Sequence, residues 1–89
     1  MKKKQAVVDR SDVSNLSLAK QTKIFLELLD EEAQVKRDKL FSISSLRDMA
    51  KNMRMRVGDF YGFIDRLNQE GHFLKKGNDL YYLMTDSTL

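Results

Sequence analysis

Apolar residues recur at steps of three and four in three segments of the chain, a spacing that places them on one face of a helix. The first predicted helix begins near Leu16 and extends for about 18 residues, with Ser17 or Asn15 as its capping residue. The second and third predicted helices run from about Leu46 to Met53 and from about Asp59 to Glu70. The apolar stripe of the first helix comprises Leu18, Thr22, Ile24, Phe25, Leu26, Leu28, Leu29 and Ala33.

Short polar signals mark the ends of the second and third helices. Ser45 followed by Asp48 has the spacing of a capping box and predicts the start of the second helix. Gly58 indicates a turn, and Asp59 suits the N-cap of the third helix. Gly71 suits the position just beyond the end of that helix.

Two further regions predict strands. The segment 40–43 is short and partly alternating, which is typical of a brief strand. The apolar-rich runs 72–75 and 80–84 flank a polar loop at 76–79 and predict a β-hairpin. We expect Tyr81 to be buried and Tyr82 to be exposed. The predicted core combines all these elements and comprises Phe25, Leu29, Leu46, Met49, Phe63, Ile64, Leu67, Leu74 and Leu83.

The order helix, strand, helix, turn, helix, hairpin predicts an α+β fold, the winged helix. Its second and third helices form a helix-turn-helix, and the hairpin that follows is the wing. The strand at 40–43 can pair with the hairpin and complete a small three-stranded antiparallel sheet. We expect a flexible tail over residues 1–15, the winged-helix domain over 16–84 and a free C-terminal end over 85–89.

Length and composition limit the chemistry. A chain of 89 residues forms one domain and is too short for a doubly wound sheet or a (β/α)₈ barrel. The absence of cysteine and the presence of a single histidine, His72, exclude a thiolate or multi-histidine zinc site. The sequence has neither a G-x-x-x-x-G-K-[ST] phosphate loop nor an isolated carboxylate pair. We therefore expect a non-catalytic domain without a metal or cofactor.

The distribution of charge is more informative than its sum. The net charge of +3 equals the contribution of Lys2, Lys3 and Lys4, since residues 5–89 hold thirteen cations and thirteen anions. These lysines fit part of a nuclear-import signal or an ordinary solvated chain end. No apolar run approaches the ~20 residues of a membrane span, and none follows Met1 as in a secretory signal. We expect no membrane partner.

Two basic groups are candidates for binding the DNA backbone. The stretch 47–56 carries four cations and one carboxylate, a net charge of +3. Its Arg47, Lys51 and Arg54 have the i, i+4, i+7 spacing of one helix face, and Arg56 extends this group into the turn. Lys75 and Lys76 lie in the predicted wing. Contacts from these groups to phosphates would be weak, salt-sensitive and independent of sequence. The alternative is an ordinary solvated surface.

The third helix favours protein docking over base reading. Residues 59–70 carry three carboxylates and one arginine, a net charge of −2 that phosphates repel. Asn68 and Gln69 could contact bases but lie near the C-terminal end of the helix. A second acidic group on the first helix comprises Glu27, Asp30, Glu31 and Glu32. The candidate partner-binding residues of the third helix are Tyr61, Asp65, Arg66 and Gln69.

The segment from Asp59 to Leu83 resembles the C-terminal winged helix of the minichromosome maintenance (MCM) DNA helicases. It is most similar to the paralogue that acts in homologous recombination and meiosis. The similarity covers about half of the chain, and His72 stands where an aromatic residue is expected. The matching residues are Asp59-Phe60, Phe63-Ile64, Leu67-Asn68, Gly71, Leu74-Lys75-Lys76-Gly77, Tyr81 and Leu83, with Leu46-Arg47, Ala50 and Val57 upstream.

The resemblance implies an accessory domain of a much longer, ATP-dependent helicase. It implies a nuclear protein that acts in recombination repair, meiosis or replication, and DNA as the partner of this domain. The alternative is a module that docks another helicase subunit, a regulatory protein or the ATPase of its own chain through its acidic helix faces.

Overall fold

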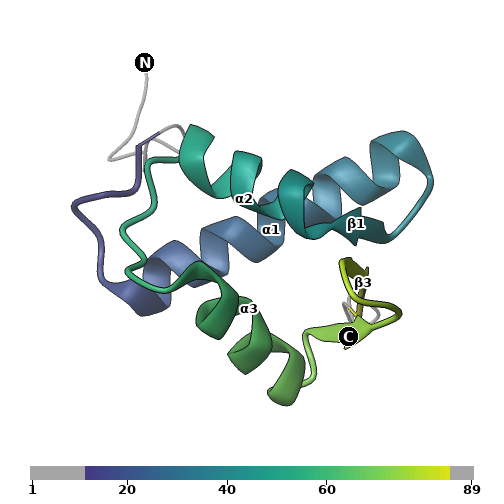
Figure 1. Cartoon of the computed structure of the whole chain (residues 1–89). Helices are drawn as coiled ribbons and strands as arrows, with labels where there is room; N and C mark the ends of the chain where they lie inside the picture. The colour runs from purple at the N-terminus through teal and green to yellow at the C-terminus, as the bar shows by residue number, and fades with distance from the viewer. Residues whose placement is uncertain (1–11, 85–89) are drawn as a thin grey trace.

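The computed structural model describes residues 12–84 and contains three helices and a three-stranded sheet. All three helices precede the hairpin, which is formed by two of the three strands (Figure 1). The predicted α+β winged helix is confirmed. In chain order the elements are α1 (Leu18–Lys36), β1 (Leu40–Ser42), α2 (Ile43–Asn52), α3 (Phe60–Gln69), β2 (Phe73–Lys75) and β3 (Leu80–Leu83).

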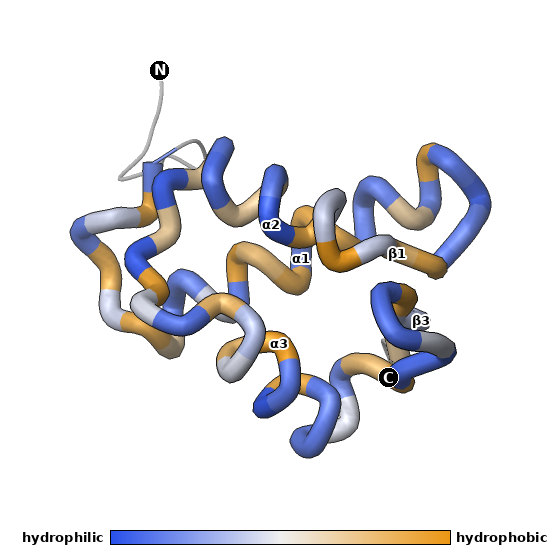
Figure 2. Tube along the Cα trace, viewed as in Figure 1, coloured by the Kyte–Doolittle hydropathy of each residue, from blue (hydrophilic) through white to orange (hydrophobic). Residues whose placement is uncertain are grey.

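Both ends of α1 follow from local chemistry. The Ser17 hydroxyl accepts a hydrogen bond from the Lys20 amide at 3.3 Å, which confirms Ser17 as the N-cap. Beyond Lys36, Arg37 adopts a left-handed conformation with φ 56°, and its N–H bonds to the Ala33 carbonyl. Buried apolar residues of α1 share one core with those of α2 and α3, and Figure 2 shows hydrophobic and hydrophilic residues interspersed along the helices.

The start of α2 differs from the prediction. Its N-cap is Ser42, whose hydroxyl accepts a hydrogen bond from the Ser45 amide at 3.1 Å. The helix therefore begins at Ile43, three residues before Leu46, and β1 ends at Ser42. The buried Ile43 side chain belongs to the helix, while its amide donates to the Asp79 carbonyl at 2.8 Å. The predicted strand was one residue too long because Ile43, a β-branched residue, directly follows the alternating segment.

The predicted signals around α3 are confirmed. Asp59 is the N-cap, and its carboxylate accepts a hydrogen bond from the Gly62 amide at 3.1 Å. A Cβ at Gly62 would lie 2.6 Å from that carboxylate, so a larger residue here would require the Asp59 side chain to shift. Gly71 has φ 90° and the His72 amide reaches back to the Leu67 carbonyl at 2.9 Å, which closes the helix end.

The sheet has the order β1-β3-β2 and is antiparallel throughout. Phe73 pairs with Leu83 and points into the core, whereas Leu74 pairs with Tyr82 on the outer face. Phe73 is 2% exposed and Leu74 is 45% exposed. The prediction of Leu74 as a core residue is therefore wrong, because side chains alternate across a sheet and Phe73 occupies the inner position.

The rest of the predicted core is mostly confirmed, and Tyr81 is buried as expected. Met49 is only partly buried and packs against the core. The predicted tail over 1–15 is too long, because Val13 is fully buried and its amide donates to the Met53 carbonyl at 2.8 Å. Residues 1–11 and 85–89 lie outside the described part of the chain. The confirmed core predictions are Phe25, Leu29, Leu46, Phe63, Ile64, Leu67 and Leu83.

The register of the hairpin predicts a sharp difference between two neighbouring substitutions. Phe73→Ala removes a buried ring that contacts Tyr81 at a centroid distance of 5.9 Å. It should lower the free energy of unfolding by about 3–5 kcal/mol. Leu74→Ala, its matched control, should change this free energy by less than about 0.5 kcal/mol. Chemical denaturation of both variants measures this, and equal losses would contradict the register.

Candidate nucleic-acid interface

The cations predicted to form one helix face occupy two kinds of structure. Arg47 and Lys51 lie on α2, but α2 ends at Asn52 and Arg54 has the left-handed φ of 59°. The Met55 amide bonds to the Ala50 carbonyl at 3.0 Å, which closes the helix before Arg54. The predicted helical face through Arg54 is therefore wrong. The sequence has no glycine at the C-terminal end of α2, and the i, i+4, i+7 spacing of the cations therefore placed Arg54 on the helix.

Arg47 is held by a residue of α3. Its guanidinium donates a hydrogen bond to the Tyr61 hydroxyl and lies 5.1 Å from the centre of the tyrosine ring. A residue predicted to bind DNA and one predicted to bind a partner are thus in contact. Their sequence spacing gave no sign of this contact, which depends on how α2 packs against α3.

Arg47 and Lys51 border a shallow depression between α2 and the start of α3. Its volume is about 200 Å³, and its apolar lining comes from Ala50, Met55, Val57 and Phe60. Arg54 and the exposed Arg56 continue the chain into the turn that precedes α3. We call the set Arg47, Lys51, Arg54 and Arg56 the basic junction.

Three contacts fix the turn of the basic junction. The Arg56 amide donates to the side-chain oxygen of Gln21 at 3.0 Å, and Gln21 is only 3% exposed. The Gln21 side-chain NH₂ donates to the Leu16 carbonyl at 2.8 Å. The bond from the Val13 amide to the Met53 carbonyl holds the start of the turn. The turn therefore rests on the N-terminal segment and α1.

One carboxylate lies near the basic junction. Hydrogen bonds from the Ser14 hydroxyl and amide to Asp12 measure 2.6 and 3.1 Å. These bonds lower the pKa of the Asp12 carboxyl, and the positive charge of Arg54 lowers it further. Asp12 is thus stabilised as an anion, and it offsets part of the charge of Arg54.

The wing lysines, Lys75 and Lys76, form a separate basic group. Both are exposed, and the Lys76 ammonium lies 5.8 Å from the centre of the Tyr82 ring. The Lys76 amide donates to the Leu80 carbonyl at 2.8 Å and closes the hairpin. The basic junction precedes α3 and the wing lysines follow it, so α3 separates the two groups (Figure 1).

The exposed side chains of α3 pair with one another. The side-chain NH₂ of Gln69 donates to the Asp65 carboxylate at 2.9 Å, and Arg66 forms an ion pair with Glu70 at 3.3 Å. Tyr61 is 57% exposed, although its hydroxyl is engaged by Arg47. The predicted partner-binding residues therefore share one helix but form three separate contacts rather than a single cluster.

Residues 12–84 contain neither a metal-binding cluster nor a membrane-spanning helix. This part of the chain holds no group of three or more histidine, cysteine, aspartate or glutamate side chains placed to ligate a metal ion. Within the same residues, no helix combines the length and apolar character needed to cross a membrane.

A helix-turn-helix formed by α2 and α3, followed at once by a hairpin wing, defines a winged-helix domain. The chain belongs to the family described as the MCM8 winged helix domain, whose sequence model matches residues 8–85. The resemblance to the MCM helicases is thereby confirmed.

Named relatives agree with this family. The chain is 42% identical over 72 residues to DNA helicase MCM8 of Gallus gallus, covering 81% of this chain and 9% of the relative. It is 39% identical over 75 residues to DNA helicase MCM8 of Homo sapiens, covering 84% of this chain and 9% of the relative. For Probable DNA helicase MCM8 of Arabidopsis thaliana the identity is 33% over 81 residues, 91% of this chain and 10% of the relative. The chain thus spans about a tenth of the length of these relatives.

Proposed function

We propose that this chain is a non-catalytic module of an ATP-dependent DNA helicase and that it binds DNA weakly through the phosphate backbone. The names of its relatives support a helicase as the parent protein. The sequence itself has no phosphate-binding loop of the G-x-x-x-x-G-K-[ST] type. A nuclear location and a role in recombination repair, meiosis or replication form part of the same proposal.

The basic junction is the observation that carries the DNA-binding proposal. Arg47 and Lys51 line the depression beside the start of α3, and Arg54 and Arg56 follow in the turn that leads from α2 to α3. Arg47 uses one N–H to reach Tyr61, and the remaining donors of its guanidinium stay available for a phosphate. The contact with the tyrosine also orders the arginine in advance, which lowers the entropy cost of binding.

The same charges argue for weak and unspecific binding. Asp12 offsets part of the charge of Arg54, and the residues of α3 with its caps carry a net charge of −2. Carboxylates on α3 disfavour its insertion into the major groove, where bases are read. Contacts made only to phosphates position a protein on DNA without selecting a sequence.

Charge reversal at the basic junction tests this function. The double variant Lys51→Glu/Arg56→Glu should weaken binding to a labelled duplex by at least about tenfold at low salt. It should also reduce the slope of log affinity against log salt by about 2, since each phosphate contact contributes about 0.9. Fluorescence anisotropy at several salt concentrations measures both quantities.

The matched control is Lys20→Glu/Lys23→Glu, which makes the same charge change at exposed positions of α1. This control should retain most of the affinity and the original slope. DNA binding by the double variant equal to that of the control would refute the role of the basic junction. No binding by the unmodified chain at low salt would refute DNA binding altogether.

Protein docking through α3 is the second candidate function. The exposed Tyr61 and the carboxylate of Asp65 lie on the same helix, one turn apart, and suit a basic partner. Docking through this helix keeps α3 out of the DNA groove. It therefore makes the charge of Asp65 unimportant for DNA affinity.

Asp65→Asn separates docking from groove reading. At physiological salt we expect its DNA affinity to stay within about twofold of the unmodified chain, because an exposed charge outside the groove is largely screened. Glu27→Gln, an equal charge change on α1, is the control for the same duplex titration. A several-fold tightening seen only for Asp65→Asn would place α3 in the groove and contradict this expectation.

A further inference from the structure

The helix α2 presents opposite charges on its two sides. Arg47 and Lys51 line the depression toward α3, whereas Ser45, Asp48, Met49 and Asn52 line a groove toward α1. At 100° per residue the centres of these two sets lie about 130° apart around the helix, and Asp48 is about 60° from Lys51. The groove and the basic junction are therefore adjoining surfaces that face in different directions.

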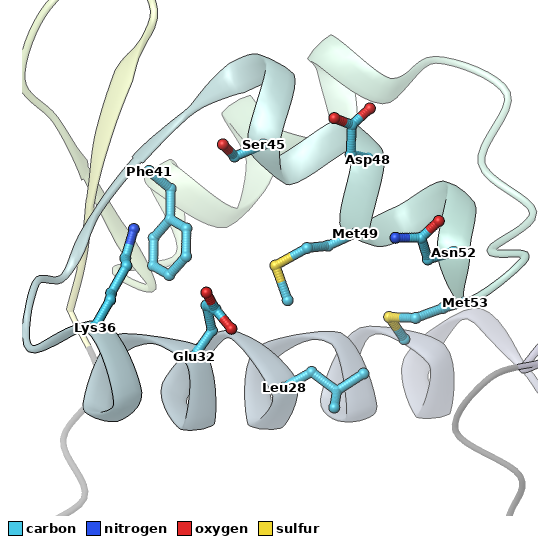
Figure 3. A pocket seen from close by; sticks show the side chains of 9 residues that line it. All are labelled: Leu28, Glu32, Lys36, Phe41, Ser45, Asp48, Met49, Asn52 and Met53. Atoms are coloured by element: carbon cyan, nitrogen blue, oxygen red, sulfur yellow. The ribbon is translucent and has the colours of Figure 1, made fainter.

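The groove has an apolar floor with adaptable side chains. Its volume is about 640 Å³, within the range of about 300–1,000 Å³ usual for concave binding sites. Figure 3 shows Met49 reaching from α2 toward α1, with Leu28 below it and the Phe41 ring at one end. Methionine is unbranched and polarizable, so Met49 and Met53 can adjust to different apolar side chains.

The rim of the groove is acidic. Glu32 and Asp48 line it, and the neighbouring residues 27–36 of α1 carry four carboxylates and one lysine, a net charge of −3. The lysine is Lys36, whose ammonium donates to the Leu40 carbonyl at 2.6 Å and lies 3.9 Å from the centre of the Phe41 ring. Lys36 is thus engaged within the domain, and the charge offered to a partner is negative.

We propose that this groove binds a basic amphipathic helix of a partner protein. Leu28, Glu32 and Lys36 follow one face of α1 for two turns, about 12 Å. An apolar stripe of a helix laid along this length would contact the floor, and lysine or arginine beside the stripe would face Glu32 and Asp48. Nucleic acid is disfavoured as the occupant, because the carboxylates of Glu32 and Asp48 repel phosphate.

A defined peptide tests the proposal without knowledge of the natural partner. The probe is a synthetic helical peptide of leucine, alanine and lysine with the leucines on one face. Controls are the same peptide with glutamate in place of lysine, and a scrambled sequence. Methyl NMR signals of Met49 and Met53 report binding in the groove, and those of Met55 and Met84 report on other surfaces.

The basic peptide should shift the signals of Met49 and Met53 in a saturable manner and leave those of Met55 and Met84 in place. Its affinity should fall several-fold in Glu32→Gln/Asp48→Asn and in the exposed rim variant Asn52→Arg. Asp79→Asn, a control that removes an exposed carboxylate of the hairpin loop, should bind as the unmodified chain does. Lys51→Glu/Arg56→Glu should also bind the peptide without loss, so failure of DNA binding and failure of this proposal are distinguishable.

Several results would overturn the proposal. Equal binding of the glutamate or scrambled peptide would remove the role of charge and of the helical stripe. Shifts at Met49 caused by duplex DNA would assign the groove to nucleic acid. Concentration-dependent shifts without peptide would assign it to a second copy of the chain. If removal of residues 1–11 shifted the Met49 and Met53 signals in the absence of peptide, the groove would be assigned to the N-terminal segment of the chain itself.

Discussion

The buried side-chain amide of Gln21 is the contact on which the helix-turn-helix depends. Its oxygen accepts from the Arg56 amide at 3.0 Å, and its nitrogen donates to the Leu16 carbonyl at 2.8 Å. One side chain thereby joins Leu16, before α1, to Arg56, which lies in the turn before α3 and 35 residues after Gln21. The side-chain oxygen and nitrogen of Gln21 each have a hydrogen-bond partner, which lowers the cost of burying this polar side chain.

This anchoring explains how a nearly neutral domain presents separated charges. With the turn fixed from beneath by Gln21 and Val13, the cations that follow α2 are left at the surface beside Arg47 and Lys51. The acidic residues of α1 and Asp48 lie on the other side of α2. The two proposed binding surfaces therefore differ in charge although they share one helix.

Sequence reasoning succeeded where local chemistry decides the structure. The caps Ser17 and Asp59, the closing Gly71 and the hairpin could be predicted because each depends on neighbours within a few residues. The order of these elements, together with the resemblance to the MCM helicases, was enough to identify the winged helix. The residues of the basic junction and of the wing could be predicted from the sequence, but the spatial arrangement of these two groups could not.

Three of the failures share a different cause, whereas the start of α2 at Ser42 instead of Ser45 was a choice between two local capping residues. Burial of Phe73 instead of Leu74 depends on strand register, and the contact of Arg47 with Tyr61 depends on the packing of α2 against α3. The burial of Val13 depends on a distant carbonyl of Met53. None of these pairings is expressed in local periodicity. The apolar pattern identifies the residues that are candidates for burial, and tertiary packing decides which of them are buried.

Native-state hydrogen exchange at the Arg56 amide tests the role of Gln21 most directly. In the unmodified chain this amide should be protected, and Gln21→Ala should lower its protection at least about tenfold while reducing the free energy of unfolding by about 1–3 kcal/mol. The control is Gln34→Ala on the same helix, whose exposed amide bonds only to Asp30 among the contacts described, at 2.9 Å. Unchanged protection and stability in Gln21→Ala, as expected for Gln34→Ala, would contradict the account.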